Sequence, residues 1–190
     1  MKTDQSLSDN LDSVPEELTA GYRGLLLIKR SKDGEKGNCQ RKSIKRITEN
    51  TEMWKSSVLE LLELKKTVYP EHRIYSSANE RNLTKAIQEF KRRQLHMDCG
   101  NVNDLKHFYC DIENRFFSCL MNPGSRSQNK FLIDCDTAEE YEIAKNQLDV
   151  SGLIILDYPT RNGRHIITKP FNPNEYLPMQ IKKDDLIYIA

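Results

Sequence analysis

The run from Phe131 to Asp136 is the feature that most constrains the fold, because an apolar stretch ends there in two carboxylates one residue apart. Side chains alternate between the two faces of a strand, so Asp134 and Asp136 are predicted to share one face. Two carboxylates this close together repel each other, which costs free energy unless positive charge lies between them. Two divalent cations that hold a triphosphate would supply that positive charge. The alternative is a strand that ends in solvent, where Asp136 begins a turn and Thr137 caps the next helix.

Signals for strands and helices follow this run in a regular order. A capping-box spacing at Thr137–Glu140 opens a helix, and Gly152–Leu156 is an apolar strand. The dipeptide Asn162-Gly163 predicts a hairpin leading into a strand at Arg164–Thr168, and Asp184–Ile189 is the last strand. The order β-α-β-β-(α)-β predicts the α+β class, with helices packed on a mixed sheet similar to a ferredoxin or RNA-recognition core.

The chain is expected to divide into three parts. Residues 1–20 are polar and are predicted to be a flexible tail, residues 21–125 to form a mostly helical N-terminal part packed on the core, and residues 126–190 to form the core itself. Within the middle part, the spacing of apolar residues predicts the following elements: strands at Gly24–Ile28 and Arg73–Ser77, a loop at 31–38, and helices around 54–62, 83–90 and 105–120.

Composition excludes several classes of protein. The 190 residues carry a net charge of +1, and no apolar run approaches the roughly 20 residues that span a bilayer, so no membrane partner is expected. The first ten residues lack the apolar core of a signal peptide, which predicts a cytoplasmic protein. Five irregularly spaced cysteines without a C-x-x-C pair argue against a disulfide framework and against structural zinc.

Positive charge is unevenly spread along the chain. Between Arg23 and Arg46 there are nine Lys or Arg residues and two acids, and Lys91, Arg92 and Arg93 form a second cluster. Such stretches are usually solvated loops and helix faces, and the alternative interpretation is a surface that follows the phosphates of a nucleic acid.

The hairpin places cationic groups near the acid pair. A backbone made tight by Gly163 and flanked by Arg164, His165 and Lys169 suits a triphosphate. On a strand, His165 and Lys169 share one face, which would align the two groups. The alternative is a half-exposed histidine on an edge strand.

Two further acids, Asp184 and Asp185, open the final strand. Only one of them can face the acid pair, and either could complete a metal site. Three carboxylates around two Mg²⁺ ions is an arrangement used for phosphoryl and nucleotidyl transfer. The alternative is a turn acid that precedes a strand.

Taken together, these residues resemble three motifs of the archaeo-eukaryotic primase and primase-polymerase superfamily. The first motif is similar to Asp134-Cys135-Asp136, and the second to Thr160–His165, continued as far as Phe171. The third is similar to Lys182–Asp184, before the apolar end of the chain. The resemblance covers residues 130–190, and the chain is similar in particular to short bacteriophage proteins that carry this core without a helicase.

The resemblance implies both a chemistry and a set of site residues. It implies that Asp134, Asp136 and Asp184 bind Mg²⁺ or Mn²⁺, and that His165 contacts the phosphates of the incoming nucleotide. Arg164 and Lys169 flank that histidine as nucleotide-binding candidates, and the segment beginning at Arg73 is a further nucleotide- or template-facing candidate. The implied partners are nucleoside triphosphates, a single-stranded DNA or RNA template, and a helicase or other replication protein in the cytoplasm of the host.

Three functions remain open at this point. The leading hypothesis is a metal-dependent nucleotidyltransferase that joins nucleotides on a template. The chain ends directly after the third motif and has no zinc module, so a nucleotide pocket is better supported than processive synthesis. The second hypothesis is a nucleotide- or single-strand-binding accessory protein without chemistry. The third is a metal-dependent nuclease or nucleotide hydrolase that uses the same acids.

Overall fold

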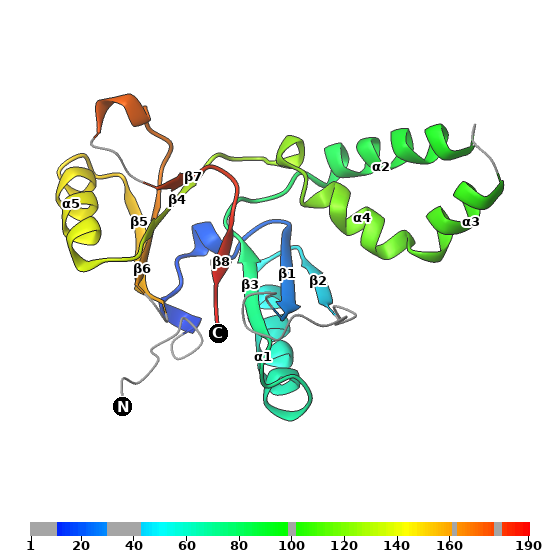
Figure 1. Cartoon of the computed structure of the whole chain (residues 1–190), viewed down its shortest axis with the longest axis horizontal. Helices are drawn as coiled ribbons and strands as arrows, with labels where there is room; N and C mark the ends of the chain where they lie inside the picture. The colour runs from blue at the N-terminus through cyan, green and yellow to red at the C-terminus, as the bar shows by residue number, and fades with distance from the viewer. Residues whose placement is uncertain (1–10, 30–42, 99–101, 161–162, 177–179) are drawn as a thin grey trace.

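The computed structural model describes residues 11–29, 43–98, 102–160, 163–176 and 180–190, and it has two four-stranded sheets with helices around them (Figure 1). Every pair of neighbouring strands in the two sheets is antiparallel. The chain combines helices with antiparallel sheets, which confirms the predicted α+β class.

The first sheet is built mainly from the N-terminal part of the chain. Its strands lie in the order β2 (Ile44–Thr48), β1 (Arg23–Ile28), β3 (Arg73–Ser77) and β8 (Leu186–Tyr188). Helix α1 (Thr51–Thr67) packs on it through Trp54, Val58 and Leu61, which are fully buried. The Trp54 indole also donates a 3.0 Å hydrogen bond to Ser76 Oγ on β3, so its one polar atom is satisfied inside the core.

The second sheet contains the acid run. Its order is β5 (Ile154–Pro159), β6 (Arg164–Thr168), β4 (Phe131–Cys135) and β7 (Ile181–Lys182). Helix α5 (Ala138–Asp149) begins at the predicted capping box and covers one face of this sheet. Strand β6 lies between β4 and β5, as in the split β-α-β arrangement of ferredoxin-like sheets.

The predicted final strand at Asp184–Ile189 corresponds to β8, but a short strand that was not predicted, β7, precedes it. Strand β7 pairs with β4 and closes the second sheet, whereas β8 pairs with β3 in the first sheet. The backbone of Ile74 continues this pairing, because its N–H donates to Ala190 O and its carbonyl accepts from Ile189 N. The last ten residues therefore connect the two sheets.

Three helices form an arm that extends away from both sheets (Figure 1). The helical arm consists of α2 (Leu83–Asp98), α3 (Val102–Cys110) and α4 (Ile112–Leu120). The sequence predicted one continuous helix over 105–120, but the chain breaks between α3 and α4 at Asp111. The Phe90 ring contacts the rings of Phe108 and Phe116, at centroid separations of 5.6 and 5.7 Å, and these contacts hold the arm together.

One apolar core joins the two sheets. Leu25, Leu27 and Ile74 of the first sheet belong to the same buried cluster as Leu132 and Ile167 of the second. The cluster also contains Val14 and Leu18, so residues 11–20 do not form the flexible tail that their polar composition predicted. Two buried apolar side chains are enough to hold this segment against the core.

Some predictions fall on positions outside the described residues. These are the first ten residues, the loop at 31–38, Cys39, Cys99 and the hairpin residue Asn162. Within the described parts of the chain, none of the helices combines the length and the apolar character needed to cross a membrane.

Two cationic side chains are buried where the N-terminal segment meets the sheets. Arg23 donates to Ser77 O, Ala78 O and Glu17 O, and the Lys130 ammonium also donates to Glu17 O. Burial, followed by the nearby charge of Arg23, lowers the pKa of Lys130 to about 8. Lys130 is only 4% exposed, so its charge is costly to keep in the folded state.

We expect this burial to make the free energy of unfolding rise between pH 8 and pH 10. In the unfolded chain Lys130 keeps its proton up to its ordinary pKa of 10.5, whereas in the folded protein it loses the proton near 8. Unfolding in this range takes up a proton, so raising the pH favours the folded state. Urea unfolding of the wild-type protein and of Lys130→Met tests this. The free energy of unfolding of the wild-type protein should rise with pH relative to that of Lys130→Met. The same pH dependence in both proteins would contradict the lowered pKa of Lys130.

Candidate functional site

Strand pairing brings Asp134 and His165 together. The two residues lie opposite each other in the β4–β6 ladder, and His165 is in turn opposite Tyr158 in the β5–β6 ladder. Side chains at directly opposed positions project to the same face of a sheet. Three neighbouring strands therefore place a carboxylate, an imidazole and a phenol in one row on the face away from α5.

The Asp134 carboxylate is engaged on both of its oxygens. His165 Nε2 lies 3.1 Å from Oδ1, and the Lys182 ammonium lies 2.8 Å from Oδ2. Burial alone would raise the pKa of Asp134, but the hydrogen bond from Lys182 and the neighbouring His165 outweigh it and hold the pKa below its ordinary value. The group is therefore a carboxylate at neutral pH.

Tyr158 fixes the state of the histidine ring. Its hydroxyl lies 2.9 Å from His165 Nδ1, and burial raises the pKa of Tyr158 well above its ordinary value, so the phenol keeps its proton. Burial also lowers the pKa of His165, which favours the neutral ring. A phenol that donates to Nδ1 leaves the ring proton on Nε2, from which it is donated to Asp134. Tyr158 and His165 thus orient the carboxylate.

Lys182 links this row to a second acid. Its ammonium lies 2.8 Å from Asp134 and 3.3 Å from Asp185 Oδ2. Asp185 belongs to the first sheet, because its carbonyl accepts a hydrogen bond from Ala78 N directly after β3. We call Tyr158, His165, Asp134, Lys182 and Asp185 the Asp134 cluster. It spans the junction of the two sheets, with one carboxylate carried by each.

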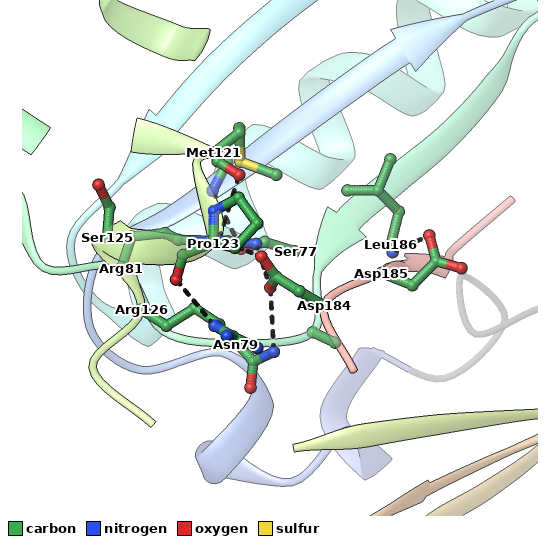
Figure 2. A network of polar contacts seen from close by, with 12 residues as sticks. Ser77, Asn79, Arg81, Met121, Pro123, Ser125, Arg126, Asp184, Asp185 and Leu186 are labelled. Atoms are coloured by element: carbon green, nitrogen blue, oxygen red, sulfur yellow. Dashed lines mark hydrogen bonds and ion pairs between the residues drawn. The ribbon is translucent and has the colours of Figure 1, made fainter. Parts of the chain in front are cut away.

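Asp184, the predicted third metal ligand, does not join this cluster. Its carboxylate accepts two hydrogen bonds from the Arg81 guanidinium, at 2.9 and 3.1 Å, and a third from Asn79 (Figure 2). Figure 2 shows Asp184 pointing toward these residues and Asp185 pointing away from them. Both members of the pair with Arg81 are buried, since their side chains are 1% and 9% exposed. Asp185, which the sequence left as the alternative third acid, is the one near Asp134.

Asp136 lies just beyond the end of β4 and is exposed. Its backbone N–H donates to Glu140 Oε2, so the residue belongs to the turn that leads into the capping box of α5. Asp134 and Asp136 both line a hollow of about 300 Å³ between β4 and α5. The Asp134 side chain itself points to the other face of the sheet, where it contacts the histidine and the lysine.

The three predicted nucleotide-binding cations are dispersed. Arg164 turns to the opposite face, where it pairs with Asp157 at 2.9 Å and lies over the Tyr141 ring. Lys169 follows the end of β6 and is exposed, and Arg73 begins β3 in the first sheet. Alternation along β6 accounts for Arg164, because it is adjacent to His165 and must face the other side.

The Asp134 cluster offers two carboxylates, from Asp134 and Asp185, as ligands for a hard divalent cation. Asp134 and Asp185 both contact one positive charge, that of Lys182, and Mg²⁺ is commonly held by one or two carboxylates together with phosphates of the substrate. Among the described residues, no set of three or more His, Cys, Asp or Glu side chains is arranged to hold a metal ion. Lys182 is 37% exposed, so its side chain can turn toward solvent and leave the two carboxylates to a cation.

Two members of the cluster, Tyr158 and Lys182, were not assigned a role from the sequence. The register of the hairpin is the signal that could have found Tyr158, because it places this residue opposite His165. Lys182 had no comparable signal. It reaches Asp134 only because β7 pairs with β4, with Lys182 opposite Leu132 and hence diagonal to Asp134.

Gly163 allows the ends of β4 and β6 to approach closely, and this pairing brings Asp134 and His165 together. A Cβ at this position would lie 2.1 Å from the Cys135 carbonyl oxygen, and backbone cannot yield as a flexible side chain can. We expect Gly163→Ala to separate the ends of β4 and β6 and to lower the free energy of unfolding by about 1–3 kcal/mol. Urea unfolding measures this loss. Gly152→Ala is the comparison for general loop strain, because its positive φ makes it strained without any close neighbour. Wild-type stability in Gly163→Ala would contradict the close approach.

Comparison of the chain with family models, with curated proteins and with solved structures gave no match.

Proposed function

We propose that the protein is a metal-dependent nucleotidyltransferase of the primase-polymerase kind, and that the Asp134 cluster is its active site. The observation that carries this proposal is the pair of carboxylates, Asp134 and Asp185, that meet one positive charge at the junction of two sheets. A histidine held in one protonation state supports the first of these acids. Carboxylates fixed in this way match the demand of phosphoryl chemistry for positioned negative ligands.

Asp134 and Asp185 would hold Mg²⁺ or Mn²⁺ in this reaction. The ion would supply charge neutralisation at the triphosphate, which lowers the barrier to in-line attack by a 3′-hydroxyl. Lys182, displaced from between the acids, reaches the phosphates as a cationic contact. His165 and Tyr158 keep the Asp134 carboxylate in place, so their role is to position a ligand rather than to transfer a proton.

A second candidate is binding of a nucleotide without chemistry. It is favoured by Lys182, whose ammonium already satisfies both carboxylates. A lysine in this place provides the neutralising charge that a metal ion would otherwise bring. Under this alternative the cluster is a stable ion-pair network beside a phosphate-binding surface.

Thermal unfolding in the presence of triphosphates separates the two. We expect Mn²⁺ and a nucleoside triphosphate together to raise the melting temperature by several degrees more than either alone, because ligands that share a site stabilise the folded state jointly. A primer-extension assay with labelled triphosphate then tests for product. Extension of a strand supports transfer, triphosphate consumption without a longer strand indicates hydrolysis, and triphosphate binding independent of metal supports the binder.

A further inference from the structure

The base of the helical arm is fixed firmly to the two sheets. Arg81 forms β-bridges with Tyr22 on one side and with Arg126 on the other. Asn82 N donates to Ser125 O, and Ser127 N donates to Glu80 O, so the outgoing and returning chains are hydrogen-bonded to each other. The arm that Figure 1 shows extending from the sheets therefore starts from a rigid root.

A polar groove lies at this root. It has a volume of about 480 Å³ and is lined from α2 by Lys85, Gln88, Glu89 and Arg92, and from the facing turn by Asn122 and Gly124. We call it the arm-root groove. Lys85 and Arg92 are seven residues apart, which places them on one face of α2 about 10 Å apart along its axis. Every side chain named in its lining is polar or charged.

The cations of this groove are available to a ligand. Within the described part of the chain the Lys85 side chain has no ion-pair partner, and Arg92 is 69% exposed. Among the described residues Arg92 pairs with Glu89, an acid that it shares with Arg93. Exposed ion pairs of this kind contribute little stability, so phosphate can replace Glu89 at small cost. The lining of the groove thus carries two cations, Lys85 and Arg92, against one carboxylate, Glu89.

The groove leads toward the Asp134 cluster. Arg126, directly after the groove wall, donates a 2.9 Å hydrogen bond to Lys183 O, and Lys183 is the residue that follows Lys182. The Lys183 ammonium lies over the Phe131 ring at the start of β4. The hydrogen bond of Arg126 thus joins the wall of the groove to the loop that carries Lys182 and Asp185.

We propose that the arm-root groove binds the sugar–phosphate backbone of a single-stranded nucleic acid and directs it toward the Asp134 cluster. This inference rests on the proposed function, because the strand would be the template or primer of that reaction. Cations spaced along a helix face suit the repeating charge of such a backbone, and the amides of Gln88 and Asn122 can contact sugars or bases. A polar lining with this excess of cations does not suit an apolar protein partner.

Fluorescence anisotropy with a labelled mixed-sequence 20-mer, as DNA and as RNA, tests the groove without requiring catalysis. We expect Lys85→Gln with Arg92→Gln to weaken binding at least about tenfold, and to reduce the salt slope by about 1.4, the value for two lost phosphate contacts. The matched control is Lys66→Gln with Lys106→Gln, which removes two exposed charges from α1 and α3. Lys85→Arg with Arg92→Lys keeps the charge and should bind like the wild-type protein.

The outcomes separate this inference from the proposed function. Asp134→Asn should bind the strand normally, so loss of transfer with binding intact leaves the groove assignment standing. An equal loss of strand binding in the Lys85/Arg92 variant and in its matched control would overturn the assignment of the arm-root groove. Stronger binding of polyglutamate than of either nucleic acid would also overturn it, because the groove would then recognise an acidic polypeptide.

Discussion

Asp134→Asn is expected to reduce nucleotide incorporation about a thousandfold or more, while the protein remains folded. The substitution keeps the size of the side chain but removes the negative charge that His165 and Lys182 contact. The carboxylate oxygens of Asp134 lie 3.1 Å from His165 Nε2 and 2.8 Å from the Lys182 ammonium, which also lies 3.3 Å from Asp185. An asparagine can still accept from one of them, and Lys182 can turn to solvent.

The measurement is primer extension with labelled triphosphate and Mn²⁺, together with a thermal unfolding curve. Asp149→Asn is the matched control, because it removes one exposed carboxylate at the end of α5, away from the cluster. Asp185→Asn should lower incorporation in the same way. Incorporation at the wild-type rate by Asp134→Asn would show that this carboxylate binds no catalytic metal.

The second large effect concerns stability rather than activity. Asp184→Asn is expected to lower the free energy of unfolding by about 3–5 kcal/mol, because it leaves the Arg81 charge buried without its partner. The Arg81 side chain is 1% exposed, and within the described part of the chain its Nε already lacks a hydrogen-bond partner. The remaining contact of Arg81 NH1 with Met121 O, at 3.4 Å, is too long to compensate.

Urea unfolding of three variants tests this prediction. The double variant Arg81→Leu with Asp184→Leu removes both charges, and it should be more stable than Asp184→Asn alone, because two apolar groups leave no uncompensated charge. Asp185→Asn provides the control at the adjacent position, where the side chain is 36% exposed. A loss of stability in Asp185→Asn as large as that in Asp184→Asn would contradict the distinction between the two acids.

Strong local signals predicted much of the second sheet. The apolar run at Phe131 gave β4, the capping-box spacing gave the start of α5, and the Asn-Gly dipeptide gave the pairing of β5 with β6. Each of these signals acts over a few residues, where backbone preference and hydrogen bonding decide the structure. From them the meeting of Asp134 with His165 could be anticipated before any tertiary contact was known.

Long-range contacts account for what could not be predicted. Alternation shows that Asp184 and Asp185 face opposite sides, but only Arg81, 103 residues earlier in the chain, determines which of them is buried. Strand β2 was missed because its residues are mostly half-buried and two of its five are basic. The placement of β8 in the first sheet depends on its pairing with β3, which the C-terminal residues alone do not indicate.

The crossing of the chain from β7 to β8 ties the spacing of two acids to the angle between the sheets. Asp134 moves with the second sheet, and Asp185 moves with the first through its bond to Ala78. Because one buried core joins the two sheets, a substitution in that core that changes their packing would also change the gap that Lys182 bridges.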